Sequence, residues 1–187
     1  MPWEGRLTGM DQVRIGEKLV SLTRIRLVVE QAMALRAEGL SQAEVSTRLG
    51  VDRTLISRLE SVGEIRVGHR VALIGFPVAN KAAVEQLAAR LGVDFVWVMT
   101  DAERRAFADS LSGAALIDSI LAMAARVRAF DAVVLLASDR RIQLMEALLD
   151  RSAVVPIILG EAPLDRDVLV DVPGLEQVLL ALRADGG

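Results

Sequence analysis

Four polar residues suited to nucleic-acid recognition follow one another closely after Asp52. They are Arg53, Thr54, Ser57 and Arg58. An arginine guanidinium can donate two parallel hydrogen bonds to a guanine edge, and threonine and serine hydroxyls can bond bases or phosphates. On a helix that turns about 100° per residue, these four side chains share one face, while Leu55, Ile56 and Leu59 share the opposite face. The segment therefore predicts a helix that presents two arginines and two hydroxyls to a partner.

The residues before this segment predict a second helix and a tight turn. Ser41 and Glu44 have the spacing of a capping box, in which each side chain bonds the backbone of the other. Gly50 ends this helix, because glycine readily adopts the positive φ of a tight turn. Asp52 caps the next helix, so the two helices are joined as in a helix-turn-helix. Apolar residues stand where the two helices must touch: Val45, Leu49, Val51, Ile56 and Leu59.

This segment resembles the Xre family of lambda-repressor-like regulators. The resemblance lies in Gly-Leu-Ser-Gln-x-Glu-Val, followed by Leu-Gly-Val-Asp-Arg and Ile-Ser-Arg-Leu-Glu, and it covers roughly residues 25–62. It implies that double-stranded DNA is the partner, that Gln42 opens its helix near a phosphate, and that the helix after Asp52 is the recognition helix. Ser46 departs from the family's usual alanine, and the usual five-helix bundle is not complete before the strands begin. Periodicity alone is equally typical of a helical hairpin without a DNA partner, but the ordered cap, glycine and polar face favour DNA.

Composition restricts the remaining possibilities. The 187 residues contain no cysteine, which excludes disulfides and thiolate chemistry, and 52% of them are hydrophobic. The net charge is +1 in residues 1–69 and −4 in residues 70–187, so DNA binding must depend on a local basic face. No apolar run reaches about 18 residues and no signal peptide is recognisable, so we expect a cytoplasmic protein that does not enter a membrane.

The second part of the chain alternates apolar runs with helical segments. The runs occupy residues 71–76, 95–99, 132–137, 154–159 and 168–172. The helical segments occupy residues 80–91, 101–128 with a break near 112–113, 140–151 and 174–183. This pattern predicts a doubly wound, mainly parallel, five-stranded Rossmann-like sheet. The fold class is α/β, with a small all-helical helix-turn-helix domain in residues 1–68 and the α/β domain in residues 69–187.

Boundaries inside the first domain are also predicted. Residues 13–20 form a short extended piece, and Ser21 or Thr23 caps a helix that runs to about Glu38. The apolar face of that helix comprises Ile25, Val28, Val29, Ala32 and Leu35. Gly63 and Gly68 bracket a linker.

Polar residues at the carboxyl ends of the predicted strands form a candidate ligand site. Open α/β sheets bind ligands there, and helix N-termini favour anions. The candidate residues are Asn80, Lys81, Thr100, Ser138, Arg140 and Arg141. An anionic metabolite could act there as an effector, while the alternative is that these residues are ordinary helix caps and surface charges.

Motifs for catalysis are mostly absent. There is no Gly-x-Gly-x-x-Gly after the first strand and no Walker A loop, and the sole histidine, His69, falls in the predicted linker. The first strand ends in Gly75-Phe76, where a phospho-receiver would carry an acidic pair. We expect no catalytic residue, metal or cofactor. The favoured hypothesis is a homodimeric DNA-binding regulator, with residues 114–127 as one candidate interface; the alternative is an α/β enzyme that acts on a phosphorylated small molecule and carries a helical docking module.

Overall fold

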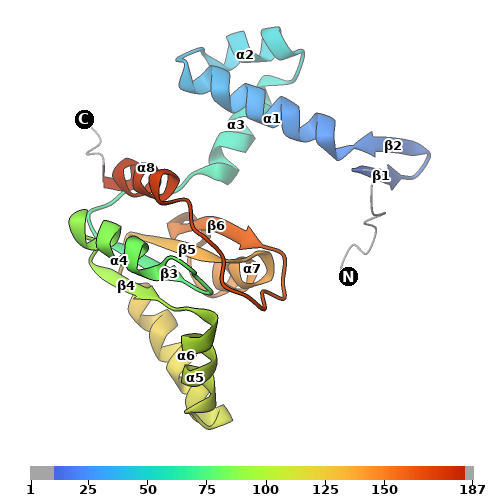
Figure 1. The fold of residues 1–187 in the computed structure, drawn as a ribbon. Coiled ribbons are helices and arrows are strands. Elements are labelled where there is room, and N and C mark those ends of the chain that lie inside the picture. The colour runs from blue at the N-terminus through green and yellow to red at the C-terminus, as the bar shows by residue number, and fades with distance from the viewer. Residues whose placement is uncertain (1–10, 184–187) are drawn as a thin grey trace. The chain divides into compact units, whose positions relative to one another are not determined.

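The chain divides into two compact units, one ending at Glu64 and the other beginning at Ile65 (Figure 1). A computed structural model describes residues 11–183. The residues after Glu64 belong to the second unit, because the N–H groups of Arg66 and Gly68 donate to the carbonyls of Ser152 and Leu182 at 2.8 and 3.2 Å. The linker predicted between Gly63 and Gly68 is therefore shorter than expected.

The first unit combines a β-hairpin with three helices. Strands β1 (Gln12–Ile15) and β2 (Lys18–Ser21) pair in antiparallel fashion around Gly16, whose φ is 59°. The helices are α1 (Leu22–Ala37), α2 (Gln42–Leu49) and α3 (Arg53–Gly63). The predicted extended piece is thus a hairpin, and the prediction that this domain is all-helical is wrong.

Local capping interactions set the helix boundaries as the sequence predicts. The Ser21 hydroxyl accepts from the backbone N–H of Arg24 at the start of α1. Ser41 and Glu44 form the complete capping box of α2, and Gly50 ends that helix with a φ of 66°. The carboxylate of Asp52 then caps α3. These contacts involve residues only a few positions apart, which explains why sequence patterns predict them well.

The core of the three helices is small. Ala32, Val45 and Ile56 are fully buried. Partly buried side chains surround them: Met33, Leu35, Leu40, Leu49 and Val51. The core residues of α1 begin at Ala32, so Ile25 is 48% exposed although the sequence places it on the buried face. Leu55 is 45% exposed, so it borders the polar face of α3 instead of closing the apolar one.

The second unit contains a four-stranded parallel sheet in the order β4-β3-β5-β6. The strands are β3 (Val71–Gly75), β4 (Phe95–Val98), β5 (Ala132–Ser138) and β6 (Val154–Gly160). The prediction of a fifth strand over residues 168–172 is wrong. Only Val168 makes a β-bridge, to Val78, because the Asn80 side chain exchanges two 2.9 Å hydrogen bonds with the backbone of Val170. These bonds hold the segment at the end of β3.

Helices cover both faces of the sheet, as expected for a doubly wound fold. Helices α4 (Lys81–Arg90) and α8 (Val172–Arg183) contribute to the core on one face. Helices α6 (Gly113–Val127) and α7 (Asp139–Leu148) contribute to the core on the other. Helix α5 (Asp101–Asp109) precedes α6, and the predicted break between them is confirmed. Figure 1 shows α5 and α6 projecting away from the sheet, and a short 3-10 helix (Arg151–Ala153) leads into β6.

The central position of β5 predicts how the second unit responds to truncation. Leu136 in β5 is fully buried, whereas Leu169 is 76% exposed. We expect Leu136→Ala to lower the free energy of unfolding by about 2–5 kcal/mol, because the change leaves a cavity. The matched variant Leu169→Ala should stay within about 0.5 kcal/mol of the wild type. Urea unfolding followed by circular dichroism compares the two, and equal losses would contradict the assignment of β5 as a buried central strand.

Candidate nucleic-acid interface

The outward face of α3 carries the residues that the sequence assigns to recognition. Arg53, Thr54 and Arg58 are exposed, and Ser57 is half-buried. Within residues 11–183, neither Arg53 nor Arg58 makes an ion pair or a side-chain hydrogen bond with the protein. Two guanidinium groups on one short helix are therefore available to an external acceptor.

The start of α3 is held by Asp52. Its carboxylate accepts a 2.6 Å hydrogen bond from the Thr54 backbone N–H. Hydrogen bonds from Thr54, through the side chain first and then the backbone, hold the pKa of Asp52 below its ordinary value. The cap is therefore an ionised carboxylate at neutral pH, and Thr54 contributes to the helix start as well as to the exposed face.

A three-residue polar cluster joins the three helices. Glu60 of α3 accepts hydrogen bonds from the Arg36 guanidinium of α1 and, at 2.7 Å, from the Gln42 side-chain amide of α2. The same guanidinium also donates to the carbonyl of Leu40. The Arg36 guanidinium, and after it the Gln42 amide, holds the pKa of Glu60 below its ordinary value. Since an amide has two N–H hydrogens and Glu60 takes one, the Gln42 amide keeps a second donor.

One further cation on this unit was missed by the sequence argument. Arg48 is exposed in the last turn of α2 and lines a shallow hollow of about 410 Å³ with Leu40, Ala43, Glu44 and Thr47. The ordinary explanation is that a cation near a helix C-terminus complements the helix dipole. Its position on the outer face of α2 was the signal that could have found it.

The residues predicted for anion binding at the strand ends have mixed surroundings. Lys81 pairs with Glu103 at 2.8 Å, and Thr100 caps α5 in a capping box with the same Glu103. Asn80 is bonded to Val170, as described above. Ser138 is buried at the end of β5, Arg140 is exposed, and Arg141 is half-buried. The fold thus uses Asn80, Lys81 and Thr100 internally, and the cations of this set that remain are the two arginines of α7.

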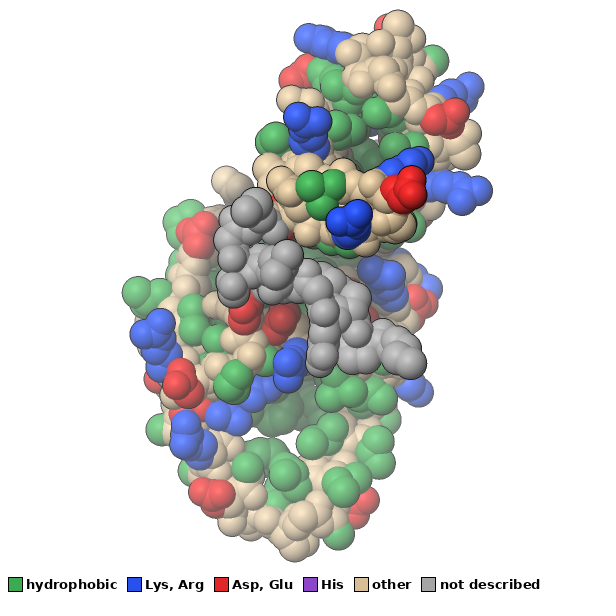
Figure 2. All heavy atoms as spheres, turned by 90° about the vertical axis from the view of Figure 1, so that its right-hand side faces the viewer, with side chains coloured by type: hydrophobic (Ala, Val, Ile, Leu, Met, Phe, Trp, Pro, Cys, Tyr) green, Lys and Arg blue, Asp and Glu red, His purple; other side chains and the backbone are tan. Residues whose placement is uncertain are grey.

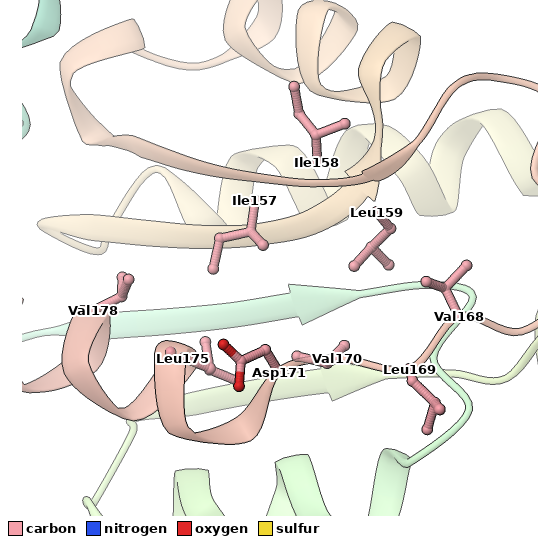
Figure 3. Close-up of a pocket in the computed structure, with 10 residues that line it drawn as sticks. Ile157, Ile158, Leu159, Val168, Leu169, Val170, Asp171, Leu175 and Val178 are labelled. Carbon is pink, nitrogen blue, oxygen red and sulfur yellow. The ribbon is translucent and has the colours of Figure 1, made fainter. Parts of the chain in front are cut away.

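A second hollow, of about 420 Å³, lies between β6 and the segment leading into α8. Figure 3 shows Ile157 and Leu159 pointing into it from β6, while Ile158 points away. Val170 and Leu175 line the opposite side, together with Asp171. Because Asp171 is acidic and the other named side chains are apolar, this hollow is unsuited to an anion.

No family model, no curated protein and no solved structure matches the chain. Within the part of the chain that the structure describes, no cluster of three or more His, Cys, Asp or Glu side chains could hold a metal ion. No helix in that part is long and apolar enough to cross a membrane. The Xre resemblance therefore stays a prediction.

The cluster around Glu60 predicts acid sensitivity in the first unit. Its pKa in the folded protein lies below the ordinary 4.5, so its stabilising effect is complete above that value and is lost as pH falls through the lower, folded-state pKa. We expect Glu60→Gln to flatten the loss of stability between about pH 5 and pH 3. The free energy of unfolding of the first unit is measured at both pH values by urea titration, followed through the NMR signals of the backbone amides in α1, α2 and α3. The matched control is Glu64→Gln, an exposed carboxylate without an ion pair among the described residues; an equally flattened profile there would contradict the role of Glu60.

Proposed function

We propose that the chain is a sequence-specific regulator of transcription that binds double-stranded DNA through a helix-turn-helix formed by α2 and α3. The observation that carries the proposal is the pair of exposed arginines, Arg53 and Arg58, on a helix anchored by Ile56. Neither guanidinium has a partner within residues 11–183. The order of capping box, positive-φ glycine and second cap supports it further. The Xre resemblance belongs to the same proposal.

The dimensions of α3 suit the major groove. Its 11 residues span about 16 Å at 1.5 Å per residue, and the groove is about 12 Å wide. With α3 in the groove, Arg53 and Arg58 reach guanine edges or phosphates. Leu55, exposed beside them, can contact a thymine methyl group. The exposed apolar residue thus fits a recognition helix.

Binding affinity provides the direct test of this interface. Arg53→Ala and Arg58→Ala should each weaken binding to the preferred site by about 1–3 kcal/mol if the lost contact is to a base. The site is obtained by selecting bound fragments from a genomic library, and fluorescence anisotropy at one fixed salt concentration gives the affinities. Arg166→Ala, an exposed arginine of the second unit, is the matched control. Wild-type affinity in both α3 variants would contradict the recognition-helix assignment.

We propose further that the regulator is a homodimer whose second unit joins the two copies through α6. One small helix-turn-helix contacts little DNA, and two-fold dimers that read two half-sites about 34 Å apart are the usual solution. Ile117, Ile120 and Leu121 are spaced along one face of α6 and are 60%, 47% and 55% exposed. Figure 2 shows hydrophobic side chains gathered at the end of this unit that α5 and α6 form. An isologous contact between two such faces would bury them.

The oligomeric state tests the α6 interface. The double variant Ile117→Glu, Leu121→Glu should be monomeric at micromolar concentration, because it places two charges in each half of the contact. Ile158→Glu changes an equally exposed residue, 63% exposed on β6, and should remain dimeric. Light scattering distinguishes the two states. A monomeric wild type, or dissociation by Ile158→Glu alone, would contradict this interface.

A further inference from the structure

We infer that an apolar cavity between the sheet and helices α6 and α7 binds a small amphipathic carboxylate, whose charged end pairs with Arg141. The cavity has a volume of about 210 Å³ and is lined by residues of β3, β4, β5, α6 and α7. Among the described residues that line it, Arg141 is the one that carries a charge. The inference deepens the proposed function by naming the class of effector.

The cavity lies where open α/β sheets bind ligands. From β3 the chain continues to β4 at one edge of the sheet, and from β5 it continues to β6 at the other edge. The order in which strands are added therefore reverses between the parallel neighbours β3 and β5. Crevices at such switch points, near the carboxyl ends of the strands, are the usual ligand sites. The wall includes Ile74 and Phe76 at the end of β3 and Leu135 and Ala137 near the end of β5. The position of the cavity thus agrees with a binding role.

Arg141 carries an unsatisfied hydrogen-bond donor. Its Nη1 atom is buried and has no hydrogen-bond partner in the described part of the chain, and the guanidinium lies 5.2 Å from the centre of the Phe76 ring. Burial, and after it the nearby positive charge of Arg104, lowers the pKa of Arg141. The carboxylate of Asp101, whose negative charge opposes this lowering, is already bonded to Arg104 and to Arg105. An unpaired donor on a desolvated charge is unfavourable, and an incoming carboxylate would satisfy it.

The lining selects a carboxylate with an apolar body. A phosphate dianion needs several donors, whereas this wall offers one guanidinium surrounded by aromatic, aliphatic and thioether side chains. Trp97 lies edge-on to Phe76, with ring centres 6.2 Å apart, and Met123 and Met145 supply adaptable contacts. A cavity of about 150 Å³ holds a benzene ring. The larger cavity here therefore accommodates one aromatic ring with a short carboxylate arm, or a short alkyl carboxylate.

Occupancy of the cavity has a consequence for the proposed dimer. Ile120 and Leu144 line the cavity and are also 47% and 58% exposed, and Ile120 belongs to the apolar face of α6. A ligand that orders these side chains would alter the dimer contact and, through it, DNA affinity. This consequence rests on the proposed function; binding of the carboxylate does not.

Binding is tested on the full chain without DNA. The probes are phenylacetate, indole-3-acetate, hexanoate and octanoate, each beside its uncharged primary amide, with inorganic phosphate as a further comparison. At saturating concentration the fitting carboxylates should raise the melting temperature by a few degrees, whereas the amides and phosphate should not. Trp97 fluorescence, in a Trp3→Phe background that leaves it the only tryptophan, gives a readout independent of stability.

Two variants separate the charge from the cavity. Arg141→Met keeps an unbranched apolar stem and removes the charge, so the free protein should be at least as stable, and the preference for carboxylates over amides should disappear. Arg140→Met, its exposed neighbour on α7, should bind like the wild type. Ala124→Leu fills the cavity and should abolish binding of all probes.

The outcomes are distinct. No response of the wild type to any carboxylate at millimolar concentration, or an unchanged response in Arg141→Met, would overturn the inference. If Arg141→Met removes carboxylate binding, the site is supported. If the bound carboxylate leaves the DNA affinity of the wild type unchanged, the coupling between this site and DNA binding is contradicted.

Discussion

The second unit is organised by the need to cover both faces of a parallel sheet. All seven residues of β5 and all five of β3 are buried, so helices must pack on each side. Crossover connections supply α4 on one face and α6 and α7 on the other, and α8, which follows β6, packs beside α4. Winding in both directions from the centre places the switch point between β3 and β5. The apolar cavity beside that point, and the exposed face of α6 next to it, are consequences of this arrangement.

The first unit depends on a different balance, because its core is too small to fix α3 by packing alone. Among the described residues of this unit, three side chains form the fully buried core, and the polar cluster of Arg36, Gln42 and Glu60 adds one attachment from each helix. Glu60 lies two residues beyond Arg58 and seven beyond Arg53, on the side of α3 that faces α1 and α2. Holding that side determines which way Arg53 and Arg58 face, so the geometry of the proposed interface depends on residues that need not touch DNA.

Most elements were predictable from sequence because their signals are local. The boundaries of α2 and the start of α3 are defined within a few residues by Ser41 with Glu44, by Gly50 and by Asp52. The uninterrupted apolar runs of β3 and β5 are typical of strands buried on both faces. Residues 168–172 carry the same kind of run, yet they form no strand, because the side chain of Asn80, some 90 positions away in sequence, holds Val170. The prediction that Leu55 and Ile25 are buried was wrong for a related reason. A helical wheel shows which residues share a face of a helix, but not how much of that face a neighbouring element covers.

Sequence patterns report local environment and not long-range contacts, so they predict only part of the cavity site that contains Arg141. It marks Arg141 as a basic residue at a helix start, where a cation is ordinarily a surface charge. The structure instead places its guanidinium against Phe76, 65 positions away in sequence, in a wall otherwise free of charge. Replacing such a group by an apolar one of similar size is commonly neutral or stabilising, so stability alone does not account for an arginine there. A ligand that brings its own negative charge does account for it, since the guanidinium then discriminates carboxylates from neutral molecules of the same shape.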